Sequence, residues 1–65
     1  MKLMINGEPH ETGQTTVSGL LAELAIQPER VAVEVNHAII RRIEFDSFLL
    51  NDGDAVEIVN FVGGG

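Results

Sequence analysis

A single stretch with helical periodicity, enclosed by stretches with strand periodicity, most constrains the fold of this chain. Four apolar residues are spaced i, i+3, i+4 and i+7, which places them on one face of a helix: Val17, Leu20, Leu21 and Leu24. Thr15 or Thr16 can cap its N-terminus, and Gln27-Pro28 is expected to stop it, so we predict a helix from Val17 to Ala25. The rest of the chain must cover this apolar face.

The segment before the helix predicts a β-hairpin. Lys2 to Asn6 alternates between apolar and more polar residues, as a half-buried strand does. Asn6-Gly7 then favours a tight turn with positive φ at both positions. A second strand should run from about Glu8 to Thr12, where Pro9 suits a sheet edge because it has no N–H group.

Three further strands are expected after the helix, and the middle one is short. The segment Val31 to Val35 alternates β-branched residues with others and is the clearest strand. Asn36-His37 indicates a turn into a short strand, Ala38 to Arg41, and the next apolar residues follow no clean period, which predicts a loop with a 3₁₀ turn. Asp52-Gly53-Asp54 indicates another turn before the last strand, Ala55 to Val62.

This order of elements predicts an α+β fold. A helix after an antiparallel hairpin must cross the sheet, and the last strand is best placed at the sheet centre, parallel to the first. The arrangement is a β-grasp (ubiquitin-like) roll, a mixed sheet with one principal helix. We expect residues 1–62 to form this domain, residues 63–65 to form a flexible tail, and ten apolar residues to form the core: Leu3, Ile5, Val17, Leu20, Leu21, Leu24, Val33, Val35, Val56 and Ile58.

Composition excludes several classes of protein and partner. The chain has 65 residues and no cysteine, so it forms one small domain without disulfides or thiolate chemistry. Its formal charge of −6 has the wrong sign for nucleic acid, and a protein with a basic docking face is the better partner. No long apolar run or signal-peptide pattern occurs, so we expect a cytoplasmic protein that binds no membrane.

The glycine tail Gly63-Gly64-Gly65 follows an apolar strand and ends in a free carboxylate. Glycine gives the backbone a small cross-section and access to unusual torsions, which suits a tail that threads a narrow channel. A terminal carboxylate has a pKa of about 3.3 to 3.7, so at neutral pH it is ionised and must be activated before a nucleophile can attack it. The sequence shows no Walker loop, cysteine or catalytic triad for this activation, which indicates a carrier or substrate with no catalytic residues of its own.

The chain resembles the ThiS family, the sulfur carrier proteins of thiamin biosynthesis, over its whole length. The resemblance rests on the Asn6-Gly7 hairpin, the segment Val35-Asn36-His37-Ala38-Ile39-Ile40, the turn and strand from Asp52 to Ile58, and the ending Phe61-Val62-Gly63-Gly64-Gly65. The family requires the last two glycines, so Gly63 is interpreted as an extension of the hinge.

The resemblance implies a reaction sequence carried out by other proteins. An E1-like adenylyltransferase (ThiF-like) would adenylate Gly65 with ATP, recognising the tail through Gly63 and Gly64. Sulfur from cysteine, delivered through a cysteine desulfurase, would displace AMP and leave a thiocarboxylate. A thiazole synthase (ThiG-like) would then take that sulfur, and the carrier itself would bind no cofactor.

Docking to these partners is expected on the outer face of the sheet. Alternation that sends Val56 and Ile58 inward sends Val59 and Phe61 outward, and it does the same for Met4 on the first strand. An exposed apolar patch beside the tail would mark an interaction surface. The competing interpretation is that chain from a loop or from the end of the sequence covers Phe61.

Metal sites are not predicted. His10 and His37 have no further ligand at a suitable spacing and are interpreted as exposed turn histidines. Asp52 and Asp54 resemble the start of a calcium loop, but the remaining ligands are missing and a β-turn explains them. Arg41 and Arg42 are interpreted as a solvated edge.

Two alternatives remain open from the residues alone. The small subunit of molybdopterin synthase also ends in Gly-Gly and uses a thiocarboxylate, although its chain is usually longer. A β-grasp interaction module with an inert tail belongs to a different class, and neither spacing nor composition excludes it.

Overall fold

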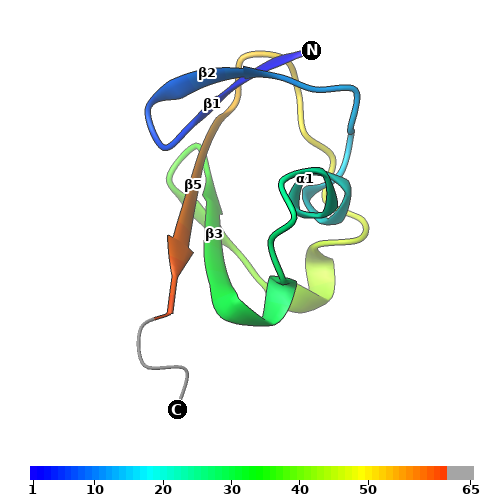
Figure 1. Cartoon of the computed structure of the whole chain (residues 1–65), viewed down its shortest axis with the longest axis vertical. Helices are drawn as coiled ribbons and strands as arrows, with labels where there is room; N and C mark the ends of the chain where they lie inside the picture. The colour runs from blue at the N-terminus through cyan, green and yellow to red at the C-terminus, as the bar shows by residue number, and fades with distance from the viewer. Residues whose placement is uncertain (62–65) are drawn as a thin grey trace.

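The computed structural model describes residues 1–61, and its elements follow the predicted order (Figure 1). The strands are β1 (Lys2–Ile5), β2 (Glu8–Glu11), β3 (Val31–Val35), β4 (Ala38–Ile40) and β5 (Ala55–Asn60). The helices are α1 (Val17–Glu23) and two 3₁₀ turns, η1 (Pro28–Arg30) and η2 (Arg42–Glu44). Val62, which the last strand was expected to include, and the expected tail of residues 63–65 lie outside the described residues.

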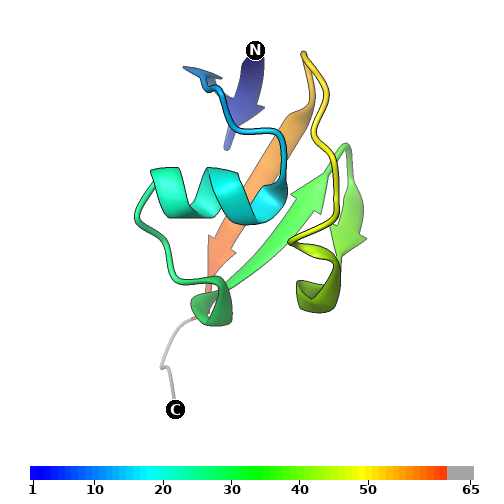
Figure 2. The ribbon, with the colours of Figure 1, turned by 90° about the vertical axis from the view of Figure 1, so that its right-hand side faces the viewer.

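The sheet has the order β2-β1-β5-β3-β4, with β5 at its centre. β5 runs parallel to β1 and antiparallel to β3, while β1–β2 and β3–β4 are antiparallel pairs. Figure 2 shows α1 lying across one face of the sheet. The predicted β-grasp fold, a mixed sheet with one principal helix, is therefore confirmed.

Both two-residue turns between paired strands use left-handed backbone. Asn6 and Gly7 have φ values of 50° and 84°, and Asn36 and His37 have values of 52° and 72°. Positive φ at both central positions is the geometry whose twist matches that of the flanking strands. Asparagine tolerates this region better than most residues, so the two Asn positions help to fix the hairpin registers.

The helix is shorter than predicted and ends for a different reason. Thr16 caps its start, because the Oγ1 atom accepts a hydrogen bond from the Gly19 N–H at 3.0 Å. At its end Ala25 has a φ of 59°, and the Ile26 N–H donates to the Leu21 carbonyl at 2.9 Å. This is a Schellman-type closure. The left-handed residue ends the helix before Pro28 is reached.

The last strand also ends earlier than predicted, at Asn60. Asn60 pairs with Val31, the first residue of β3, so no further strand partner remains on that side. One more backbone bond continues the pairing, from the Phe61 N–H to the Arg30 carbonyl at 2.8 Å. β3 has the predicted bounds, while β1, β2 and β4 each end one residue earlier than predicted.

The core lies between α1 and the inner face of the sheet. Seven of the ten predicted core residues are buried: Leu3, Val17, Leu20, Leu21, Val33, Val35 and Val56. Ile5, Leu24 and Ile58 pack against this cluster but are only partly buried. The prediction missed four further buried residues: Val31, Ile40, Phe45 and Leu50. Phe45 and Leu50 were missed because they come from the aperiodic segment, where no periodicity indicates which residues join the core.

Truncation of a core side chain tests this packing. Leu21 is fully buried on α1, so Leu21→Ala should lower the free energy of unfolding by about 2 to 5 kcal/mol, through lost burial and the cavity left behind. Urea unfolding followed by circular dichroism measures the change. Leu49→Ala removes the same atoms from a side chain that is 64% exposed and should have little effect. Equal losses in both variants would contradict the observed placement of the helix.

Candidate functional site

The strand that leads to the glycine tail lies at the centre of the sheet. β5 is hydrogen-bonded to β1 on one side and to β3 on the other, and its Val56 side chain is 1% exposed. Its end lies at the opposite end of the molecule from the N-terminus (Figure 1). The predicted adenylated residue Gly65 and the predicted recognition residues Gly63 and Gly64 lie outside the described residues. The structure therefore describes the base from which they extend.

A side-chain amide extends the pairing of β5 toward the tail. The Asn6 Oδ1 atom accepts from the Ile58 N–H at 2.8 Å, and its Nδ2 group donates to the Ile58 carbonyl at 3.2 Å. The amide thus occupies the place of a further residue of β1. Because β1 turns away at Asn6, this contact keeps β5 paired beyond the point where its parallel partner ends.

The other end of β5 is held by the Asp52-Gly53-Asp54 turn. Asp52 accepts a hydrogen bond from the Lys2 N–H at 2.7 Å, and Asp54 accepts one from the Asn36 side chain at 2.9 Å. The Asn36 Oδ1 atom accepts in turn from the Ala55 N–H at 3.0 Å. These carboxylates hold the starts of β1 and β5 and the end of β3, which agrees with the interpretation of the motif as a turn.

The three predicted docking residues are all exposed, but they are not all adjacent to one another. The exposed fractions are 37% for Met4, 56% for Val59 and 59% for Phe61. Met4 is paired with Ala55, at the start of β5, while Val59 is four residues further along. At about 3.3 Å per residue this is roughly 13 Å, so only Val59 and Phe61 lie beside the start of the tail.

Sequence reasoning did not select Ile39, which is 74% exposed. Ile39 is paired with Glu34 of β3, whose side chain belongs to the outer face, while its neighbour Ile40 is buried. Two adjacent isoleucines give no sign of which one points outward. Only the register of β4 against β3 decides this.

An open hollow adjoins Phe61 at the same end of the sheet. Its volume is about 520 Å³, and it lies between the two 3₁₀ turns and the ends of the neighbouring strands, lined by Pro28, Glu29, Val31, Ala32, Ile40, Arg42, Phe45 and Phe61. Phe61 therefore forms part of the wall of this hollow while remaining exposed. The surface beside the tail combines exposed apolar groups with a concave floor.

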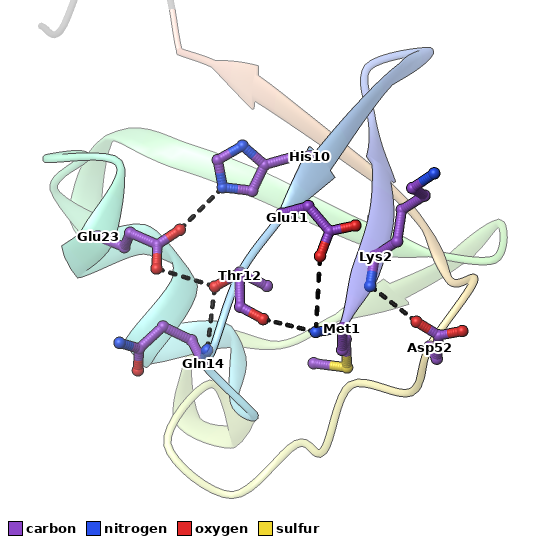
Figure 3. Close-up of polar contacts among 8 residues, drawn as sticks. All are labelled: Met1, Lys2, His10, Glu11, Thr12, Gln14, Glu23 and Asp52. Carbon is purple, nitrogen blue, oxygen red and sulfur yellow. Dashed lines mark hydrogen bonds and ion pairs between the residues drawn. The ribbon is translucent and has the colours of Figure 1, made fainter.

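The interpretation of His10 as a turn histidine is wrong, whereas His37 lies in an exposed turn as expected. His10 lies on β2, and its Nε2 atom is 2.8 Å from the Glu23 Oε2 atom on α1 (Figure 3). Glu23 also accepts a hydrogen bond from Thr12 Oγ1 at 2.9 Å, and Thr12 is buried. Within residues 1–61, no group of three or more His, Cys, Asp or Glu side chains is arranged to hold a metal.

These contacts stabilise the ionised form of Glu23. The hydrogen bond with His10, followed by that from Thr12, lowers the pKa of the Glu23 carboxyl below its ordinary value. Because the pKa of Glu23 is lower in the folded state than in the unfolded state, its carboxylate stabilises the fold at pH values above the unfolded-state pKa. This contribution is lost as the pH falls through the folded-state pKa. The edge strand β2 is therefore attached to α1 in a pH-dependent way.

Charge removal at Glu23 tests this dependence. Glu23→Gln should melt at a lower temperature than the parent near pH 6, and the difference should shrink as the pH falls well below the unfolded glutamate pKa of about 4.3, because the parent carboxylate is then protonated too. Melting curves from pH 3 to 7 measure it. Glu8→Gln, which removes an exposed carboxylate from the strand of His10, is the control. A difference independent of pH would contradict this account of the Glu23 contacts.

Comparison with known proteins finds the same family over nearly the whole chain. Residues 3–65 match the model of the ThiS family. The sulfur carrier protein ThiS of Bacillus subtilis is 39% identical over 97% of this chain and 98% of its own length. A crystal structure of the thiamine biosynthesis protein ThiS from Geobacter metallireducens covers all of both chains, with 40% identity and a TM-score of 0.85.

A longer relative adds a second observation. A thiazole synthase of Magnetococcus marinus is 48% identical to this chain over its full length, and the chain spans 20% of the length of that protein. A domain similar to this one is thus part of a thiazole synthase chain in that organism. Across residues 1–61, no helix is both long and apolar enough to cross a membrane.

Proposed function

This chain belongs to the ThiS family, and we propose that it carries the sulfur used for thiazole formation in thiamin biosynthesis. The observation that carries the proposal is the family match, which runs to Gly65 and so includes the terminal glycines. The relative named as a thiazole synthase supports the same assignment, because a similar domain shares a chain with that enzyme.

The proposed chemistry takes place at the Gly65 carboxylate and is performed by other proteins. One carboxylate oxygen attacks the α-phosphate of ATP, which releases pyrophosphate and forms an acyl adenylate. Sulfur derived from cysteine through a desulfurase is carried as a persulfide, whose outer sulfur displaces AMP and forms an acyl disulfide. A thiol then reduces the S–S bond, which leaves the thiocarboxylate on Gly65 and a disulfide on the sulfur donor. The chain acts as a carrier and substrate, uses no cofactor of its own, and would act in the cytoplasm, where ATP is supplied.

The described fold suits a carrier because β5, which precedes the glycine tail in the sequence, is held firmly by the rest of the domain. Central pairing, the buried Val56 side chain and the Asn6 amide hold β5 against the core. A partner that docks on this domain therefore also defines where the tail begins. We propose the exposed residues Val59 and Phe61 as contacts beside that point, and Met4 as a more distant contact.

Two partners are proposed for this surface. The first is an E1-like adenylyltransferase (ThiF-like), which must hold the tail over ATP. The second is a thiazole synthase (ThiG-like), which must accept sulfur from the same tail. The cysteine desulfurase supplies sulfur and need not contact the carrier itself.

Activation of the tail is tested by a substitution at the penultimate position. Gly64→Val should leave folding unchanged and block adenylation, because the branched side chain widens the tail and restricts its torsions. ATP–pyrophosphate exchange with the activating enzyme measures the first step. Intact mass measures the second, since replacing one terminal oxygen by sulfur adds about 16 Da to the parent protein and nothing to an inert module. Normal exchange by the variant would contradict threading of the tail into a narrow channel.

Docking is tested separately from chemistry. Phe61→Ala should weaken binding to the activating enzyme by about 1 to 3 kcal/mol, as for an interface anchor, because the ring is 59% exposed beside the tail. The defect should appear mainly as a raised KM, with thiocarboxylate still formed at saturating enzyme. Leu49→Ala, which removes another exposed apolar side chain elsewhere, is the control. A fall in melting temperature typical of a core phenylalanine would contradict the exposed placement of the ring.

A further inference from the structure

Two glutamates face each other at the middle of the outer face of the sheet. Glu34 on β3 is paired directly with Glu57 on β5. Backbone bonds from Asn36 N–H to Ala55 carbonyl and from Phe61 N–H to Arg30 carbonyl fix the alternation along this pair of strands. They place the two glutamates at a hydrogen-bonded position, where Cα atoms are about 5.5 Å apart and both side chains project from the same face.

The charge of this pair is not balanced within the described part of the chain. The ion pairs found in residues 1–61 do not include Glu34 or Glu57. Arg41, which follows the neighbouring strand β4, has its guanidinium 3.7 Å from Glu44 instead. Like charges placed directly opposite each other destabilise a sheet. A local conflict of this kind in an otherwise consistent fold is typical of a functional surface.

Exposed apolar side chains surround the pair. Ile39 is paired with Glu34 on the side away from Glu57, and its side chain is 74% exposed. Val59 lies two residues beyond Glu57 on the same face, toward the tail, with 56% of its side chain exposed. Met4 lies toward the other end of the face. Together these features form a surface with a negative centre and an apolar rim, which we call the outer-face patch: Met4, Glu34, Ile39, Glu57 and Val59.

We propose that the outer-face patch docks a basic side chain of the activating enzyme, an arginine by preference, set in an apolar surface. Arginine fits because its planar guanidinium presents several donors to carboxylates and is weakly hydrated, so it can be buried against Ile39 and Val59. The net charge of −6 adds long-range attraction to a basic face. This inference rests on the proposed function, since it concerns the partner that adenylates the tail.

Such a contact would do more than add affinity. Glu57 lies on β5 itself, in the strand that continues to the tail. A cation bound between Glu34 and Glu57 would fix both the lateral position and the rotation of β5 on the enzyme surface. A bound cation would also relieve the repulsion between Glu34 and Glu57. Binding to the pair would therefore be more favourable than binding to one glutamate alone.

Charge removal at the pair is the test. Glu34→Gln, Glu57→Gln and the double variant keep the size of the side chains, and Glu8→Gln removes the same charge from exposed β2 as a matched control. Association rate and Kd with the activating enzyme are measured at several salt concentrations, together with melting temperature. The double variant should bind on the order of tenfold more weakly, with a flatter salt dependence, and should melt no lower than the parent.

The outcomes separate this inference from the proposed function. Unchanged affinity and salt dependence in the double variant would overturn the inference while leaving the carrier function intact, provided that the parent protein still gains about 16 Da on sulfur transfer. An equal loss in Glu8→Gln would also overturn it, because net charge alone would then explain the effect. A parent protein that neither binds the enzyme nor gains mass would overturn both. If the double variant unfolds, Glu57→Gln alone decides, since Glu57 is exposed.

Discussion

The central position of β5 is the constraint on which the rest of this structure depends. A strand paired on both edges, with Val56 buried beneath α1, can move only if the sheet and the core open together. In a domain of this size, which buries only about 60% of the surface of its unfolded chain, such pairing on both edges is a large part of what holds a strand in place. The chain thus places its last strand, the one that continues to the glycine tail, between two neighbouring strands.

Short strands make side-chain amides important for this arrangement. β1 has only four residues and pairs with β5 only at Ala55 and Val56, so backbone pairing holds little of β5 on this side. Asn6 extends the parallel pairing toward the tail, and Asn36 with Asp54 closes the other end of the strand. Residues that a sequence pattern assigns simply to turns therefore also complete the sheet. Their hydrogen-bonding capacity matters as much as their tolerance of positive φ.

The two faces of the sheet have different roles. The inner face is closed by α1 and by Phe45 and Leu50 from the aperiodic segment. The outer face has no covering element among the described residues, and it carries Glu34 opposite Glu57 among exposed apolar side chains. A lone domain gains no stability from this face. The proposed partner, with a basic group in an apolar surface, would cover it.

The sequence by itself determined the order of elements, the inward face of each long strand and the apolar stripe of the helix, because these follow from local periodicity and turn chemistry. The β-grasp topology could also be predicted, since few arrangements bury one helix face and place a strand on each edge of the last strand. Only the tertiary structure decided the burial of Phe45 and Leu50, the exposure of Ile39, the pairing of His10 with Glu23 and the opposition of Glu34 and Glu57. Each of these depends on register or on contacts between segments far apart in the chain, and a shift of one residue in register would exchange the faces.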